Sequence, residues 1–557
     1  MGKGRGQHLV MVPWLAFGHL IPFFHLSVAL AKEGFRISFL STPKNIQRLP
    51  KPPQDLTALI TFVELPLPYV DGLQEGAEAT VDLDIPNHDY LKMAFDLLRD
   101  PFRRFVTVHS PNWIIHDLLN HWTAEIAREM GLPFIPFSVF SATTLAFLGV
   151  LLPEEDRRES WPDSPRALTC SPPWIRFPSK VTLLPHEANG LFPAFYLPNG
   201  SGLSDIQRVV QAIHGCDAIA IRTCPEYERE YLDVNNKYPK PVIPVGLLPP
   251  EKTEEAGGGE WVEIFRWLDG KEARSVVFVG FGSECNLSRN DVYEIAHGLE
   301  LSNLDFLWAL RKPKWAADDG SDALPPGFVS RTTSRGVVSM GWAPQMEILA
   351  HPAIGGSLFH GGWGSIIETV QYGHALVVLP FINDQGLNAR LAVEKGLALE
   401  VERDDDGSFH REAIARALRR AVVEEDGEHL RCRSREMMAI FSDQQLHHSA
   451  SDDSRALGAK NHSPLEWVLQ QNTEHVLLLR SALPCTSTGS FTIFGGPLEI
   501  MDLLHTDPFS GSRNLLQGRG EERGGGGRKR EGGEGRPVAG LLPSRRLGGG
   551  RRRRRVF

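Results

Sequence analysis

The feature that most constrains the fold is an alternation of short apolar strands with amphipathic helices, which occurs twice along the chain. In the first half, an apolar strand at 8–14 is followed by a turn at 15–19, a helix at 20–34 and a second strand at 35–41. The same pattern begins again with a strand at 275–282. Strands separated by helices predict parallel sheets with helical crossovers. We therefore expect an α/β protein built from two Rossmann-like domains.

A stretch rich in Pro, Gly and acidic residues separates the two halves. It spans 245–260 and is typical of an inter-domain linker. A chain of 557 residues is also too long for one hydrophobic core. We predict an N-terminal domain over 1–245, a linker over 246–262, a C-terminal domain over 263–448 and a divergent tail over 449–557.

The Gly/Arg-rich sequence of this tail predicts disorder rather than a third domain. Residues 512–557 contain 14 Lys and Arg against 4 Asp and Glu, a net charge of +10, so the rest of the chain carries −19 within a total of −9. An acidic body is a poor nucleic-acid binder, and we expect no nucleic-acid partner. A tail that contacts RNA is an alternative hypothesis, which the lack of interleaved aromatic residues disfavours.

The overall composition is typical of a soluble globular protein, with 42% hydrophobic and 23% charged residues. The apolar runs are shorter than the roughly 20 residues that span a bilayer, and the N-terminus has no signal-peptide pattern. The six cysteines are scattered without the spacing of a zinc site, which fits a reducing compartment. We expect a cytoplasmic monomer with no transmembrane segment and no bound metal.

A glycine-rich turn in the second half has the pattern of a phosphate-binding site. An apolar strand at 354–359 leads into the turn at 360–365, which opens a helix at 365–373. Unpaired N–H groups at the start of a helix attract anions, and glycines let the backbone approach a phosphate closely. His360 and Ser365 can each add a side-chain donor. We therefore predict that the turn binds phosphate.

Other motif interpretations concern the turn and the chain around it. A helix-capping box formed by Ser365 and Glu368 is the structural alternative for the turn. The chain has no GxxxxGK[ST] motif, which disfavours a P-loop kinase or ATPase. At 279–285 Cys285 replaces the third glycine of the GxGxxG dinucleotide-binding fingerprint, so this match is weak. It also has no GxSxG nucleophile elbow, which disfavours a hydrolase.

Residues 342–385 resemble the signature box of plant family 1 UDP-glycosyltransferases, which reads W-x-P-Q, H-P-x-x-G, H-C-G-W-N-S-x-x-E, G-x-P and D-Q. The matching residues here are Trp342, Pro344, Gln345, His351, Pro352, Gly355, His360, Gly362, Trp363, Ser365, Glu368, Gly373, Pro380, Asp384 and Gln385. The likeness extends from about residue 8 to about residue 448. Three N-terminal segments, 13–20, 41–50 and 65–80, are most similar to the branch that glycosylates flavonoid and terpenoid glycosides, as soyasaponin rhamnosyltransferases do.

The resemblance implies the GT-B fold, in which two Rossmann-like domains face each other across a cleft. It also implies how the donor is bound. Trp342 would stack on uracil, the backbone of Ala343 would read the uracil edge, and Gln345 and Glu368 would bind the ribose. An indole offers the π-face that stacking requires. The implied diphosphate ligands are Ser283, His360 and Ser365, and the implied sugar ligands are Trp363, Asp384 and Gln385.

The chain departs from the family pattern at two glycines and at the C-terminus. Gly361 stands where Cys is usual. Gly364 stands where Asn is usual, so it keeps a backbone donor but loses a side-chain amide near the phosphate and sugar. In the family the last helix packs back on the N-terminal domain, whereas the likeness here fades after about residue 448. The segment 463–471 is a candidate substitute helix.

His19 and Asp117 are the catalytic candidates. His19 follows the first strand, and Asp117 ends an apolar strand at 113–117. The resemblance implies that His19 takes the proton of the acceptor hydroxyl and that Asp117 orients the imidazole. A neutral imidazole suits a general base near pH 7, and a buried carboxylate fixes its tautomer.

We therefore expect an inverting enzyme that transfers a hexose from a UDP-sugar to a hydroxyl of a small plant secondary metabolite or its glycoside. Gln385 favours glucose in the family, while rhamnose and xylose stay open. The expected partners are the UDP-sugar, which is a co-substrate, and a small hydrophobic acceptor or its glycoside. No other cofactor is implied. The alternative is a pseudoenzyme that binds the nucleotide sugar without turnover, because of Gly364 and the altered C-terminus.

Overall fold

The computed structural model describes residues 6–158, 161–250 and 259–442. Its first half contains a seven-stranded sheet in the order β3-β2-β1-β4-β5-β6-β7, and neighbouring strands pair in parallel. The strands are β1 His8–Val12, β2 Arg36–Ser41, β3 Ile60–Glu64, β4 Trp113–Asp117, β5 Phe134–Ser138, β6 Ile219–Ile221 and β7 Val242–Pro244. Every residue of the central strands β1 and β4 is buried, as expected for strands covered by helices on both faces.

The second half contains a six-stranded parallel sheet in the order β10-β9-β8-β11-β12-β13. Its strands are β8 Val276–Gly280, β9 Asp305–Leu310, β10 Gly336–Met340, β11 Ile354–Phe359, β12 Ala375–Val378 and β13 Ala398–Glu400. In each sheet the strand order reverses once, between β1 and β4 and between β8 and β11. Ligands of such sheets bind at the carboxyl ends of the strands beside this reversal.

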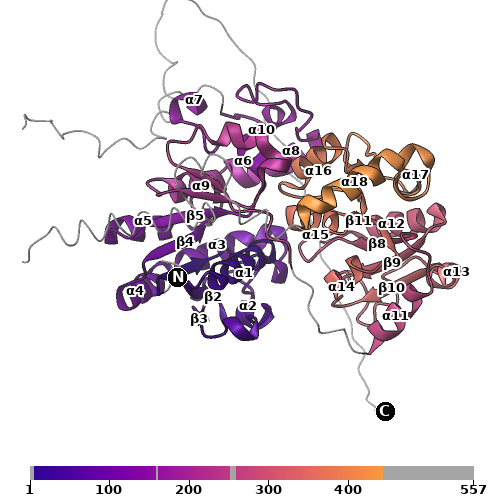
Figure 1. The fold of residues 1–557 in the computed structure, drawn as a ribbon, viewed down its shortest axis with the longest axis horizontal. Coiled ribbons are helices and arrows are strands. Elements are labelled where there is room, and N and C mark those ends of the chain that lie inside the picture. The colour runs from indigo at the N-terminus through magenta and orange to yellow at the C-terminus, as the bar shows by residue number, and fades with distance from the viewer. Residues whose placement is uncertain (1–5, 159–160, 251–258, 443–557) are drawn as a thin grey trace, which may run out of the picture. The chain divides into compact units, whose positions relative to one another are not determined.

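Helices connect the strands in both halves (Figure 1). The α-helices of the first half are α1 Phe17–Lys32, α2 Pro43–Arg48, α3 His88–Asp96, α4 Arg99–His109, α5 His121–Met130, α6 Ala142–Leu148, α7 Glu154–Arg158, α8 Pro185–Tyr196, α9 Asp205–Ile213 and α10 Pro225–Asn235. Those of the second half are α11 Glu260–Asp269, α12 Arg289–Ser302, α13 Phe328–Thr332, α14 Gln345–Leu349, α15 Trp363–Val370, α16 Gln385–Glu394, α17 Arg411–Val422 and α18 Glu428–Phe441. The 3₁₀ helices are η1 Gln54–Leu56, η2 Thr80–Asp82, η3 Ile85–Asn87, η4 Pro165–Thr169 and η5 Glu425–Gly427.

The expected alternation of strands and helices is confirmed in both halves, but two helices begin earlier than the sequence indicates. Helix α1 begins at Phe17, so His19 lies in its first turn and not in the turn before it. Helix α15 begins at Trp363 with Gly362 as its N-cap. The capping-box interpretation of Ser365 and Glu368 is therefore wrong, because Ser365 is already the third helical residue.

An apolar cluster connects the two halves of the chain. Tyr227 of α10, Trp363 of α15 and Phe441 of α18 belong to one buried group. The Phe441 ring meets the Tyr227 ring edge-on with centroids 5.2 Å apart, and Trp363 stacks on the same ring at 5.7 Å. Figure 1 shows α15, α16 and α18 together at the boundary between the halves, where α16 packs on α6. Helix α18 thus returns to the N-terminal half before the point where the family likeness fades.

Both sheets lie in one compact unit of the chain. Helix α11 begins at Glu260, inside the linker predicted over 246–262. The domain boundaries themselves remain a prediction. The predicted tail over 449–557 and the candidate helix at 463–471 lie outside the described residues.

Candidate active site

His19 and Asp117 meet at the strand reversal of the first sheet. Asp117 ends β4, and His19 lies in the first turn of α1, which follows β1. The Nδ1 atom of His19 is 2.7 Å from Oδ2 of Asp117, whose side chain is 1% exposed. The same oxygen accepts the backbone N–H of Trp14 at 3.2 Å, which fixes the carboxylate. The predicted base and its orienting partner are therefore in hydrogen-bond contact.

The pKa of His19 is set by opposing effects. Burial lowers this pKa, but the charge of Asp117 and its hydrogen bond raise it, and the net pKa lies above the ordinary value of 6.5. Asp384 and Glu284, both from the second half, raise it further through their charges. Glu284 also accepts a hydrogen bond from the Thr80 hydroxyl at 2.8 Å. The base thus lies among carboxylates from both halves of the chain.

The glycine-rich turn places His360 beside the start of α15. A Cβ atom on Gly282 would lie 2.9 Å from Cε1 of His360, and one on Gly362 would lie 2.5 Å from its Nε2. Both glycines are therefore needed to leave room for this imidazole. Its Nδ1 atom is buried without a hydrogen-bond partner among the described residues, and burial lowers the His360 pKa to about 4. A neutral imidazole with a free ring nitrogen lies where the sequence predicts phosphate.

The residues predicted to bind uridine lie after β10 and on α15. The Trp342 side chain is 77% exposed, so its ring face is open to a ligand. Trp261 donates its indole N–H to the carbonyl oxygen of Trp342 at 3.2 Å, and the neighbouring Ala343 is half-buried. Gln345 donates to Glu368 at 2.6 Å. The structure thus brings Gln345 and Glu368, the two residues expected to bind the ribose, into direct contact.

Comparison with known proteins agrees with this geometry. The profile of the family described as "UDP-glucoronosyl and UDP-glucosyl transferase" matches residues 228–427. UDP-glycosyltransferase 91C1 from Arabidopsis thaliana is 40% identical, over 78% of this chain and 93% of that protein. Soyasaponin III rhamnosyltransferase from Glycine max is also 40% identical, over 81% of this chain and 96% of that protein.

The chain belongs to the plant family 1 UDP-glycosyltransferases. The relatives are named as active transferases, so the pseudoenzyme alternative is not supported. The fold is GT-B, as in a UDP-bound transferase from Siraitia grosvenorii, with a TM-score of 0.63 and 24% identity over 84% of this chain and 99% of that one. A Glycyrrhiza uralensis glycosyltransferase, UGT73P12, gives a TM-score of 0.68 at 21% identity over 86% and 99% of the two chains.

Two of the expected sugar ligands of this glycosyltransferase, Trp363 and Gln385, form hydrogen bonds to the protein backbone with their side chains. Trp363 donates its indole N–H to the carbonyl oxygen of Arg222 at 2.7 Å. The Gln385 amide oxygen accepts the backbone N–H groups of Phe381 and Ile382 at 2.9 and 3.0 Å. Within the described residues, the backbone N–H of Trp363, the first residue of α15, has no such hydrogen bond. Asp384 is held by Asn388 at 2.8 Å, and its charge reaches His19.

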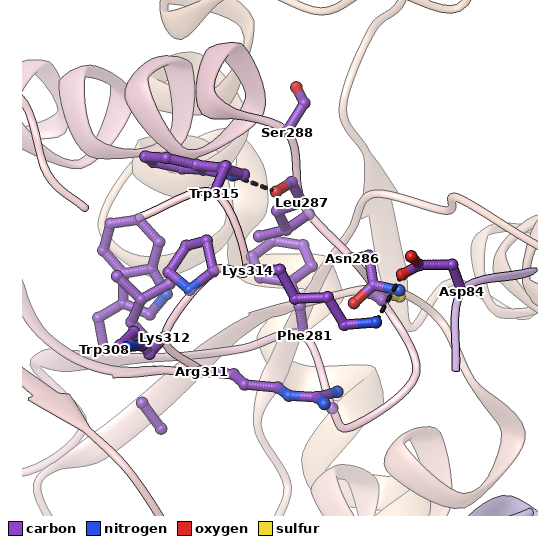
Figure 2. Close-up of a pocket in the computed structure, with 15 residues that line it drawn as sticks. Asp84, Phe281, Asn286, Leu287, Ser288, Trp308, Arg311, Lys312, Lys314 and Trp315 are labelled. Atoms are coloured by element: carbon purple, nitrogen blue, oxygen red, sulfur yellow. Dashed lines mark hydrogen bonds and ion pairs between the residues drawn. The ribbon is translucent and has the colours of Figure 1, made fainter. Parts of the chain in front are cut away.

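A cavity of about 300 Å³ lies at the carboxyl ends of β8 and β9 of the glycosyltransferase. Figure 2 shows Arg311 and Lys314 along its wall and the ion pair of Lys314 with Asp84, at 2.5 Å. Arg311 also donates to the carbonyl oxygen of Ser283, the residue expected to contact the diphosphate. The cavity is therefore cationic and adjoins the expected phosphate position.

Two residues near the site were missed by the sequence analysis of this glycosyltransferase. Glu284 directly follows Ser283, an expected diphosphate ligand, so its position just after β8 could have identified it as a residue near the site. Arg222 follows β6, and its Nη1 atom is 3.6 Å from where a Cβ would lie on Gly364. Nothing in the sequence indicates that contact, because the two residues belong to different halves.

The described residues contain neither a candidate metal-binding cluster nor a helix that could span a membrane. No group of three or more His, Cys, Asp or Glu side chains there could hold a metal ion. In the same part of the chain, no helix has both the length and the apolar character needed to cross a bilayer.

Proposed function

We propose that this glycosyltransferase moves a hexose, glucose or rhamnose, from its UDP-sugar to a hydroxyl of a small plant secondary metabolite or its glycoside, with inversion at the anomeric carbon. The observation that carries the proposal is the contact between His19 and Asp117, with Asp384 of the second half beside it. A relative at 40% identity is named Soyasaponin III rhamnosyltransferase, which supports both a glycoside acceptor and rhamnose as one donor sugar.

The chemistry follows from the tautomer of His19. Asp117 accepts the Nδ1 proton, which leaves Nε2 free to accept a proton from the acceptor hydroxyl. As that proton moves to Nε2, the acceptor oxygen forms a bond to the anomeric carbon, and the bond from that carbon to the diphosphate oxygen breaks. UDP leaves with the electron pair. A displacement from the opposite side inverts the anomeric centre.

We propose the donor contacts residue by residue. Trp342 stacks on uracil, the backbone of Ala343 reads the uracil edge, and Gln345 and Glu368 bind the ribose. The diphosphate is held by Ser283, His360, Ser365 and the N–H groups at the start of α15, which stabilise the leaving charge. Asp384 and Gln385 bind sugar hydroxyls, Gln385 through its side-chain NH2 group, because its backbone N–H donates to the carbonyl oxygen of Ile382. Trp363 and Gly364 contribute through the backbone.

We also propose a cytoplasmic monomer that uses the UDP-sugar as its only co-substrate and no metal. Light scattering of the purified chain checks the oligomeric state, and sugar transfer in excess EDTA checks the metal.

The test is sugar transfer by the purified protein with UDP-glucose and UDP-rhamnose against flavonoid, triterpene and diterpene glycosides. We expect His19→Ala to lower kcat by about 10²- to 10⁴-fold, the usual contribution of a general base. His410 is a matched control, because it also pairs with a carboxylate, Asp404 at 2.8 Å, but on the surface. His410→Ala should keep wild-type activity. Unchanged transfer by His19→Ala would overturn the mechanism.

A further inference from the structure

Arg222 is a buried cation that reaches from the first half of the chain to the start of α15. It follows β6, and its side chain is 2% exposed. Burial lowers its pKa to about 10, with the Glu368 charge acting in the opposite direction, so the guanidinium stays protonated at neutral pH. A buried positive charge needs partners for its N–H groups.

Two of the three guanidinium nitrogens of Arg222 donate hydrogen bonds to the backbone of the segment that joins the two halves. Nε donates to the carbonyl oxygen of Leu247 at 2.7 Å, and Nη2 donates to that of Leu248 at 3.1 Å. Leu248 has a φ of 49°, a left-handed backbone that few non-glycine residues adopt. These contacts hold the side chain in one direction. Within the described residues, Nη1 has no hydrogen-bond acceptor, and it is the nitrogen that faces Gly364.

The space in front of Nη1 is the space that a side chain at position 364 would enter. A Cβ on Gly364 would lie 3.6 Å from Nη1 and 4.0 Å from Oε1 of Glu368, both ordinary contact distances. An amide at 364 would extend beyond that Cβ and compete with the guanidinium. Nη1 of Arg222 therefore lies next to the space that a side chain at position 364 would enter.

The surroundings of Nη1 favour an anionic ligand. The first N–H groups of α15 lack intrahelical partners, and His360 beside them has a buried Nδ1 without an acceptor or donor among the described residues. Guanidinium groups bind phosphate strongly through charge-assisted hydrogen bonds.

We propose that Arg222 donates its Nη1 hydrogen to the diphosphate of the nucleotide bound at the start of α15, in place of the side chain that Gly364 lacks. The inference rests on the proposed donor site. It makes Arg222 a donor-binding residue supplied by the first half of the chain and held in place by the segment that joins the two halves.

The test compares UDP with uridine, which lacks the diphosphate, by titration calorimetry. We expect Arg222→Gln to raise the Kd of UDP by about 10- to 100-fold, the range of a charge-assisted hydrogen bond, and to change the Kd of uridine less than about twofold. Arg208→Gln is the matched control, because Arg208 is also a buried guanidinium but pairs with Asp96 at 2.6 Å. It should leave both Kd values unchanged.

A second variant tests whether the two positions share one contact. In the double variant Arg222→Gln with Gly364→Asn, the new amide has the space that the guanidinium left, and UDP affinity should return to within about threefold of wild type. If Arg222→Gln does not fold, Arg222→Lys keeps the charge without the fork, and it should weaken UDP by about 3- to 10-fold and spare uridine.

The outcomes separate this inference from the proposed function. Equal UDP affinity in wild type and Arg222→Gln would overturn the inference, and so would an equal loss of UDP and uridine, which indicates a purely structural role. If the double variant Arg222→Gln with Gly364→Asn does not recover UDP affinity, the two positions do not share one contact. A wild-type protein that binds UDP but transfers no sugar would overturn the proposed function alone. A wild-type protein that binds no UDP would overturn both.

Discussion

At the residue scale, the central feature is a histidine whose proton affinity is raised by its neighbours. Burial, the largest single effect, would lower the pKa of His19, but the charge and hydrogen bond of Asp117, together with the charges of Asp384 and Glu284, outweigh it. A raised folded-state pKa means that this pair stabilises the fold fully below the unfolded pKa of about 6.5 and loses that contribution as pH rises through the folded pKa. In the proposed mechanism catalysis has the opposite dependence, because only neutral His19 accepts a proton. Activity therefore rises with pH through the folded pKa of His19.

The variant Asp117→Asn tests this balance. It removes the charge that raises the His19 pKa but leaves burial, so the acidic limb of the kcat/KM profile should move to lower pH. The plateau of kcat should fall by about 10²- to 10⁴-fold, because the imidazole loses its fixed tautomer. The measurement is the pH dependence of kcat/KM for the wild type and the variant. An acidic limb that stays in place would show that Asp117 does not set the proton affinity.

Residue types and motifs predicted much of the site, and side-chain directions did not follow from them. His19 and Asp117 were identified because the family resemblance implies their roles, and because His19 follows one strand of the predicted parallel sheet and Asp117 ends another. The inward turn of the Gln385 side chain and the contact between Arg222 and Gly364 depend on packing between segments far apart in the sequence. Neither strand periodicity nor a motif carries that information.

At the element scale, the start of α15 depends on the backbone of Gly361. This residue has a φ of 80°, in the left-handed region, and a Cβ there would lie 3.2 Å from the carbonyl oxygen of Gln385. Helices α1 and α15 have no side-chain cap hydrogen bond, which is why the sequence placed their starts two or three residues late. The strands were easier to predict because continuous apolar runs mark buried parallel strands directly.

Alanine substitutions at Gly361 and Gly364 distinguish a glycine required by its left-handed backbone from a glycine whose Cβ position is unobstructed. Gly361→Ala should lower the free energy of unfolding by about 1–2 kcal/mol, because a left-handed backbone disfavours a side chain. Gly364→Ala should change it by less than about 1 kcal/mol, because the new Cβ has only ordinary contacts and alanine favours helix. Urea denaturation of both variants measures the difference. Equal stabilities would contradict the role of Gly361.

At the scale of the whole molecule, α18 joins the two halves. The chain passes through the second sheet and returns to place Phe441 against Tyr227 of α10, with Trp363 on the same ring. The sequence predicted two sheets, and the resemblance implied a last helix that returns to the N-terminal domain, but the contact of Phe441 with Tyr227 could not be inferred from either. The contact is aromatic, and it lies close to the start of α15.

Removal of this contact should destabilise the protein as a unit. Phe441 is fully buried, so Phe441→Ala should lower the free energy of unfolding by about 3–5 kcal/mol, the usual cost of deleting a core phenyl ring. Val423→Ala is the control, because Val423 is 56% exposed, and it should change stability by less than about 0.5 kcal/mol. Chemical denaturation followed by intrinsic fluorescence measures both. A small loss for Phe441→Ala would show that the contact contributes little.

The carboxylates around His19 have a consequence for how such enzymes diversify. Asp117 belongs to the half that holds the base, whereas Asp384 and Glu284 come from the other half and also raise the proton affinity of His19. We expect a chimera that takes its second half from a relative with an uncharged side chain at position 284 to have a lower His19 pKa. The pH dependence of activity would then change together with the half that holds the expected donor site.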